Sequence, residues 1–246
     1  MHSMTGEEWA GAAQLYAFLG NSLLTPMSRT ESVGLDPAFW RDLGGMCDGT
    51  LAAPAEQLAT WAERAAVDAE RSDLVQRVSV EFTKLFVGPP KPAAAPWESA
   101  NGAVASHVGF GEATFAMRER LRSLGLEVCN QNNQYEDHVG IELLYLSELC
   151  RCVSGAPEGS LGADGVAAEV NELPAAAALV RVDAAFVERF VREHPLASIG
   201  RFRAKVQAAC PDGYYVRLLD FAIALLQWQV QEASRLRVHA GWLSWL

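Results

Sequence analysis

The sequence lacks alternating runs of β-branched and polar residues, so it does not predict β-strands. It also lacks a disulfide framework, because its five cysteines are scattered and odd in number. The two closest, Cys150 and Cys152, are two positions apart and would point to different faces of a helix. These features exclude a small disulfide-bonded secreted protein and a metal site built on that cysteine pair.

No long hydrophobic run is present either. The most apolar segment, residues 218–230, is interrupted by Asp220, Gln227 and Gln229, which makes it too short and too polar to span a bilayer. The first residues contain no basic region followed by an apolar stretch and therefore predict no export signal. Together with the unpaired cysteine pattern, this predicts a cytoplasmic protein without a membrane span.

Basic residues are in the minority, with 20 Lys and Arg against 30 Asp and Glu, which gives a net charge of -10. A negative field of this kind repels phosphate backbones, so we expect no nucleic-acid partner. The same field attracts a basic peptide. The charge can equally serve only to keep the protein soluble.

What the sequence does contain is helical periodicity, which predicts an all-α fold of packed helices. The length of 246 residues suits one large domain or two small ones. Thr5 and Glu8 form a capping box for a first helix, and Asp36 and Asp183 are N-cap candidates for two others. The pair His194-Pro195 is expected to separate two helices near the C-terminus.

Two segments interrupt this pattern. Residues 88–100 contain four prolines and predict a stiff, non-helical connector. Residues 154–165 are rich in Gly, Ser, Pro and Ala and predict a flexible loop. Between them, a helix is expected from about residue 104 to residue 124, and Asn133 with Glu136 predicts a second capping box that starts a helix through Cys152.

Two motifs are candidates for a function. The proline connector can display Trp97 for recognition at low entropic cost, although the ring can equally fill the core beneath the loop. Glu136, Asp137, His138 and Glu142 fall within two helical turns. This cluster fits a patch for a basic peptide, a metal site, or simple complementation of the helix dipole.

Catalysis is less well supported. There is no Gly-x-Ser-x-Gly elbow and no phosphate loop, and the paired Glu-x-x-His motifs of a di-metal bundle are missing. His107, His194 and His239 have no acid partner nearby in the sequence, which favours structural roles. We therefore predict no catalytic residue, no metal ligand and no cofactor, and a protein that is not an enzyme.

Three segments together resemble the TorD/DmsD family of redox-enzyme maturation chaperones. They read Glu-Phe-Thr-Lys-Leu-Phe-Val-Gly-Pro at 81–89, Pro-Trp-Glu-Ser at 96–99, and Glu-Asp-His-Val-Gly-Ile-Glu-Leu at 136–143. The resemblance covers most of the chain and extends to the C-terminal helices. Tyr135 departs from it, because many members have proline there.

The resemblance implies an all-helical chaperone that binds the twin-arginine signal peptide of an exported molybdopterin oxidoreductase and assists cofactor loading before export. It implies a single-domain helical bundle over residues 1–246, present as a monomer or a domain-swapped dimer. It also implies a peptide-binding site at Trp97, Glu98, Ser99, Asp137, His138 and Glu142.

Guanidinium groups pair well with carboxylates, which suits an acidic site. The alternatives are a metal-dependent helical-bundle hydrolase that uses Glu136, Asp137, His138 and Glu142, and a structural adaptor that binds a helix. Neither the particular client enzyme nor nucleotide binding can be read from these residues.

Overall fold

The computed structural model describes residues 4–67, 69–102, 110–128, 134–155 and 181–243, with side chains as far as residue 232. This part of the chain is helical and contains no named β-strand, which confirms the all-α prediction. The α-helices are α1 (Gly6–Leu24), α2 (Pro37–Gly44), α3 (Ala52–Ala66), α4 (Arg71–Phe82), α5 (Glu98–Asn101), α6 (Glu112–Ser123), α7 (Val139–Ser154), α8 (Ala184–Glu193), α9 (Pro195–Ala209) and α10 (Tyr214–Leu243).

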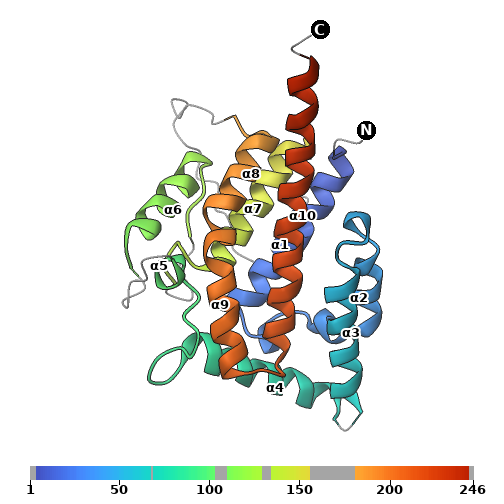
Figure 1. Cartoon of the computed structure of the whole chain (residues 1–246). Coiled ribbons are helices and arrows are strands. Elements are labelled where there is room, and N and C mark those ends of the chain that lie inside the picture. Colours follow the sequence, from blue (N-terminus) through green and yellow to red (C-terminus); the bar gives the residue numbers. More distant parts are fainter. Residues whose placement is uncertain (1–3, 68, 103–109, 129–133, 156–180, 244–246) are drawn as a thin grey trace.

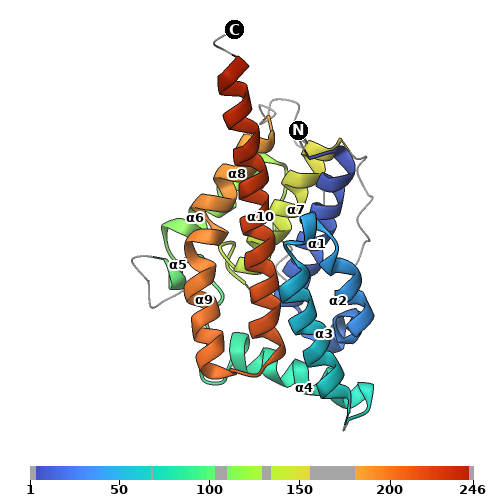
Figure 2. The ribbon, with the colours of Figure 1, turned by 45° about the vertical axis from the view of Figure 1, so that its right-hand side comes forward.

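The helices pack around α10, the long helix that runs beside α9, α8 and α3 (Figure 1). Next to them α1 and α7 form the most extensive helix pair, while α4 lies across one end of the bundle in both views (Figures 1 and 2). The short helix α5 lies against α9 and α6. One continuous hydrophobic core includes Tyr16 of α1, Trp40 of α2 and Phe221 of α10, all fully buried.

The helix starts that follow from local cap chemistry are confirmed. Thr5 and Glu8 form both hydrogen bonds of a capping box at α1. The side chains of Asp36 and Asp183 accept hydrogen bonds from the first-turn backbone of α2 and α8. The predicted separation of two helices at His194 is also confirmed, because α8 ends before this residue and α9 begins with Pro195.

The predicted helix start near Asn133 and Glu136 is wrong. The helix α7 begins at Val139, and its N-cap is His138, whose ring accepts a hydrogen bond from the backbone of Gly140. Asn133 lies outside the described residues. The residues before Val139 are non-helical because they pair with the proline connector, a contact that no local pattern predicts.

The proline connector is non-helical from Gly88 to Trp97, as expected, but the last part of the predicted segment forms the short helix α5. At its other end, residues Thr83–Val87 continue α4 as a π-helix. Of the predicted loop 154–165, Ser154 ends α7 and Gly155 adopts a left-handed conformation with φ of 70°. The remainder of that loop lies outside the described residues.

Two glycines set the close approach of α1 and α7. A Cβ on Gly20 would lie 2.7 Å from the carbonyl oxygen of Gly140, and a Cβ on Gly140 would lie 2.8 Å from the carbonyl oxygen of Gly20. Both distances are too short for a carbon–oxygen contact, so neither position accepts a side chain while the helices stay this close. The N-terminal turn of α7 is thereby held firmly against α1.

Among the described residues, no helix combines the length and the apolar character that a bilayer crossing would need.

Candidate functional site

The proline connector and the segment before α7 meet in the folded protein. Trp97 and His138 form an isolated antiparallel bridge. On either side of it, the backbone N–H of Glu98 donates to the carbonyl of Asp137 at 2.8 Å, and that of Val139 donates to the carbonyl of Pro96 at 2.9 Å. The two motifs that the sequence analysis selected are therefore one structural unit.

Asp137 holds this unit together from inside. Its side chain is fully buried, and its Oδ2 accepts a hydrogen bond from the backbone N–H of Ser99 at 2.9 Å. Its Oδ1 accepts another from the hydroxyl of Thr114 at 2.9 Å. A buried carboxylate needs such donors to offset its lost hydration. The carboxylate consequently ties α5 and α6 to the start of α7.

His138 is also buried, with 1% of its surface exposed. Its Nδ1 accepts the 2.9 Å hydrogen bond from the backbone N–H of Gly140 that caps α7. Burial lowers the pKa of this imidazole to about 3, which keeps it neutral at physiological pH. The ring is therefore a helix cap here and does not offer a charge at the surface.

Glu136 is paired at the edge of the same unit. Arg118 of α6 donates from Nε and Nη2 to its two carboxylate oxygens, at 2.6 and 3.1 Å. The guanidinium also lies over the ring of Phe115, 5.6 Å from its centroid. An incoming arginine side chain would have to compete with Arg118 for this carboxylate.

An aromatic patch covers the unit on its outer side. It consists of Trp97, Phe110, Phe115 and Tyr135, with centroid separations of 5.8 Å for Trp97–Tyr135, 5.3 Å for Phe110–Tyr135 and 5.1 Å for Phe110–Phe115. Phe110, Phe115 and Tyr135 are 41%, 50% and 38% exposed. Sequence reasoning missed Phe110 and Phe115, because the patch is assembled from separate segments that share no local spacing.

A cluster of ionisable groups lies on the inner side of α5. His194 Nδ1 is 3.0 Å from Glu98 Oε2, and Glu142 of α7 completes a group whose ligand atoms all lie within 4.8 Å of one another. Burial and the negative charge of Glu98 raise the pKa of Glu142 well above its usual range. Burial acts to raise the pKa of Glu98 too, but hydrogen bonding with His194 and Glu142 and the charges of His194 and Arg120 lower it overall.

The six predicted site residues are thus neighbours, but they differ in access. Trp97 and Glu98 are partly exposed. The other four are buried, with exposures of 9% or less: Ser99, Asp137, His138 and Glu142. A ligand on the outside can reach the first two as the protein stands, whereas contact with the others requires local opening. His194, which sequence reasoning left without an acid partner, has one in Glu98, 96 residues earlier.

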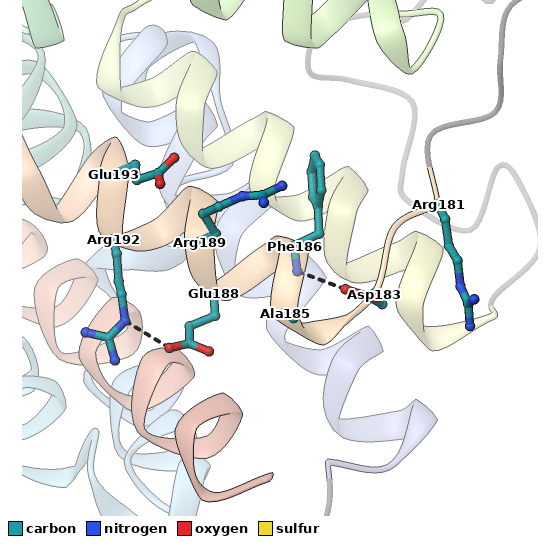
Figure 3. A pocket seen from close by; sticks show the side chains of 8 residues that line it. All are labelled: Arg181, Asp183, Ala185, Phe186, Glu188, Arg189, Arg192 and Glu193. Atoms are coloured by element: carbon teal, nitrogen blue, oxygen red, sulfur yellow. Dashed lines mark hydrogen bonds and ion pairs between the residues drawn. The ribbon is translucent and has the colours of Figure 1, made fainter. Parts of the chain in front are cut away.

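A pocket of about 880 Å³ lies elsewhere, along α8 (Figure 3). Its charged residues are mixed in sign, since Arg181, Arg189 and Arg192 stand beside Asp183, Glu188 and Glu193. Glu188 and Arg192 form an ion pair at 2.9 Å, drawn as a dashed line in Figure 3. None of the predicted site residues lines this pocket, and its three arginines make it a poor receptor for a basic peptide.

A family model described as nitrate reductase delta subunit matches residues 48–192, which is more than half of the chain. The matched segment contains the proline connector, the aromatic patch and all six predicted site residues. No curated protein and no solved structure matches the chain.

Proposed function

Because the chain belongs to the nitrate reductase delta subunit family, a family of chaperones for redox-enzyme maturation, we propose that it binds the twin-arginine signal peptide of an exported molybdopterin oxidoreductase. Binding would hold back export until the client has received its cofactor and assembled. In this proposal the protein is a cytoplasmic chaperone of the narrower TorD/DmsD type, without catalytic residues.

The observation that carries the proposal is the aromatic patch. Among the described residues, the exposed large aromatic side chains are Phe110, Phe115 and Tyr135, and all three belong to this patch. Contiguous exposed rings cost solubility and mark surfaces that bind other molecules. A signal peptide carries an apolar stretch, and this stretch is the ligand that the rings would accept.

Carboxylates beside the rings would accept the two arginines of the leader. Glu112 is exposed and lies three residues before Phe115 on α6, so the two side chains are neighbours on one helix face. Glu119 is four residues after Phe115 on the same helix. Glu136 is also available if Arg118 gives way. A guanidinium–carboxylate contact is worth roughly 1.5–3 kcal/mol. Its paired hydrogen bonds would also orient the peptide whose apolar stretch contacts the rings.

The predicted site residues would then divide into two roles. Trp97 and Glu98 would contact the peptide, because they are partly exposed. Ser99, Asp137 and His138 would position the connector, because the backbone N–H of Ser99 donates to the carboxylate of Asp137 and the ring of His138 caps α7. Glu142 is fully buried on the inner side of α5 and would therefore support the peptide site indirectly.

The test is a titration of a fluorescently labelled twin-arginine leader of a candidate client molybdopterin oxidoreductase against the full chain. We expect Phe115→Ala and Tyr135→Ala each to weaken binding about 10-fold or more. Val80→Ala removes an exposed side chain from α4, at a distance from the patch, and is the matched control with unchanged affinity. A leader with lysines in place of both arginines should bind more weakly, because lysine cannot form the paired hydrogen bonds.

Failure of the chain to bind any cognate leader would refute the proposed function. Equal affinity of the wild type and the Asp137→Ala/His138→Ala double variant would remove those two residues from the site. A helix-binding adaptor with an unrelated partner remains the alternative, and a genomic neighbourhood without a molybdoenzyme would favour it.

The geometry does not favour the hydrolase alternative. Of its four residues, Asp137 and His138 are engaged in structural hydrogen bonds, and Glu136 is paired with Arg118. Within the described residues, the group that could hold a metal ion contains Glu142 but none of the other three.

A further inference from the structure

Three side chains that can coordinate a metal ion meet on the inner side of α5, and they come from parts of the chain that are far apart in sequence. Glu98 comes from the first turn of α5, Glu142 from the first turn of α7, and His194 from the junction of α8 and α9. One potential ligand atom of each lies within 4.8 Å of the other two. Two ligand atoms bound to the same tetrahedral metal ion lie about 3.3 Å apart. The distance between His194 Nδ1 and Glu98 Oε2 is close to this value, at 3.0 Å.

The second observation is a set of buried polar atoms without partners. Glu142 is fully buried, and among the described residues neither of its carboxylate oxygens has a hydrogen-bond partner unless Glu142 is protonated and donates to Glu98. His194 Nε2 is likewise buried and has no hydrogen-bond partner. Buried polar atoms in folded proteins are almost always satisfied, and an orphaned carboxylate is among the costliest exceptions. Glu142 therefore lacks a direct hydrogen-bonding or positively charged partner for at least one of its oxygens within the described part of the chain.

A shared proton accounts for only part of this. One proton placed between Glu142 and Glu98 relieves the repulsion of the two carboxylates and satisfies one oxygen of Glu142. It leaves the second oxygen of Glu142 without a partner. A cation can bind both carboxylates and one nitrogen of the imidazole at once.

The residues around His194 hold its imidazole in place and leave it accessible to an ion from solvent. The ring of Phe190 stacks on that of His194, with centroids 5.1 Å apart and planes inclined by 30°. The side chains of Glu98 and His194 keep 15% and 11% of their surface exposed, so the cluster reaches the exterior on that side. The charge of Arg120 acts on both acids, and its Nη1 donates to the carbonyl of Ala116 at 3.2 Å.

We propose that Glu98, Glu142 and His194 form a binding site for one divalent transition-metal ion. Two carboxylates and one imidazole suit Zn²⁺ or Mn²⁺, and the second oxygen of Glu142 or a water molecule completes the coordination. The bound ion is structural: it joins the proline connector, through α5, to α7 and to the α8–α9 junction. This departs from the expectation of no metal ligand, because the sequence does not indicate that Glu98 lies beside His194.

The test is calorimetric titration of chelator-treated full-length protein with ZnCl₂ and, separately, with MnCl₂. We expect one saturable site per chain, and a rise in the melting temperature when the ion is added, since the ion binds the folded state. Glu142→Gln and Glu98→Gln each replace a ligand by an amide of the same shape and should weaken binding by at least about 100-fold. Circular dichroism establishes that each variant is folded.

Two controls separate this site from adventitious binding. Glu148→Gln changes a carboxylate on the same helix that is paired with Arg151, and it should leave the affinity unchanged. Cys152→Ser removes a thiol that is exposed among the described cysteines and should also leave the affinity unchanged. The proposal is overturned if neither ion binds saturably, or if Glu142→Gln and Glu98→Gln both bind as tightly as the wild type. Either result would leave the leader-binding proposal intact, because that is read from the peptide titration.

Discussion

The carboxylate of Asp137 accepts a hydrogen bond from the backbone N–H of Ser99, 38 residues earlier in the chain. This contact converts a proline-rich connector, which has few backbone donors of its own, into a fixed part of the bundle. It also explains why Asp137 is buried although it lies beside a surface patch. The residue acts on that surface by holding the loop that carries Trp97.

Replacing Asp137 by alanine should destabilise the protein more than replacing it by asparagine. Alanine leaves the N–H of Ser99 and the hydroxyl of Thr114 without acceptors, and we expect a loss of about 3 kcal/mol in the free energy of unfolding. Asparagine retains one acceptor oxygen and should cost less. Urea unfolding of the three proteins measures both values. A loss below about 0.5 kcal/mol for alanine would contradict this account.

Acid should destabilise the protein through His138. Its pKa is about 3 in the folded protein, below the ordinary value of 6.5, so the unfolded chain takes up the proton first. The neutral imidazole therefore contributes full stability above pH 6.5, and this is lost as the pH falls toward 3, by about 2 kcal/mol between pH 7 and pH 5. His138→Asn keeps a side-chain oxygen for the cap and should flatten the slope in this window. Equal slopes in chemical unfolding at pH 5, 6 and 7 would contradict the assignment.

A methyl group at Gly140 should be poorly tolerated. Its Cβ would meet α1, and overpacking of this kind costs about 1–3 kcal/mol. Gly200 is the matched control, because it is a helical glycine of α9 whose Cβ would meet nothing within 4 Å. Gly200→Ala should stabilise by about 0.5–1 kcal/mol, since alanine is the better helix former. In thermal unfolding, the melting temperature should therefore fall for Gly140→Ala and rise for Gly200→Ala.

Removal of Arg118 should strengthen binding of a basic leader. The variant Arg118→Ala frees both oxygens of Glu136, which now accept hydrogen bonds from that guanidinium. We expect affinity for the twin-arginine peptide to rise about 3- to 10-fold, an effect that high salt should reduce. In the Arg118→Ala/Glu136→Gln double variant the gain should vanish. A weaker complex with Arg118→Ala alone would show that Arg118 itself supports the aromatic patch.

Sequence reasoning succeeded where a structure depends on residues a few positions apart. The caps at Thr5, Asp36 and Asp183 and the break at His194 are of this kind, because a side chain and the helix turn it caps are adjacent in the chain. The pairing of the two motifs was inferred from a resemblance, and the bridge between Trp97 and His138 brings them together.

What could not be predicted depends on contacts between distant segments. Asp137 and Glu142 look like surface acids in the sequence, but both are buried. Asp137 is enclosed by its contacts with α5 and α6, and Glu142 lies beside Glu98 of α5 and His194. The partner of His194 is Glu98, and no spacing rule connects positions 96 residues apart. The exposed rings of Phe110 and Phe115 were also missed, because an apolar residue in a helical pattern is ordinarily assigned to the core.

The close fit of α1 against α7 determines how much of the chain is needed for folding. The segment matched by the family model, residues 48–192, leaves out α1, α2, α9 and α10. An expression fragment cut at those boundaries would uncover the face of α7 against which α1 packs, and it would deprive α3 and α8 of their neighbour α10. We expect such a fragment to aggregate, so the smallest autonomous folding unit must recruit helices from both ends of the polypeptide.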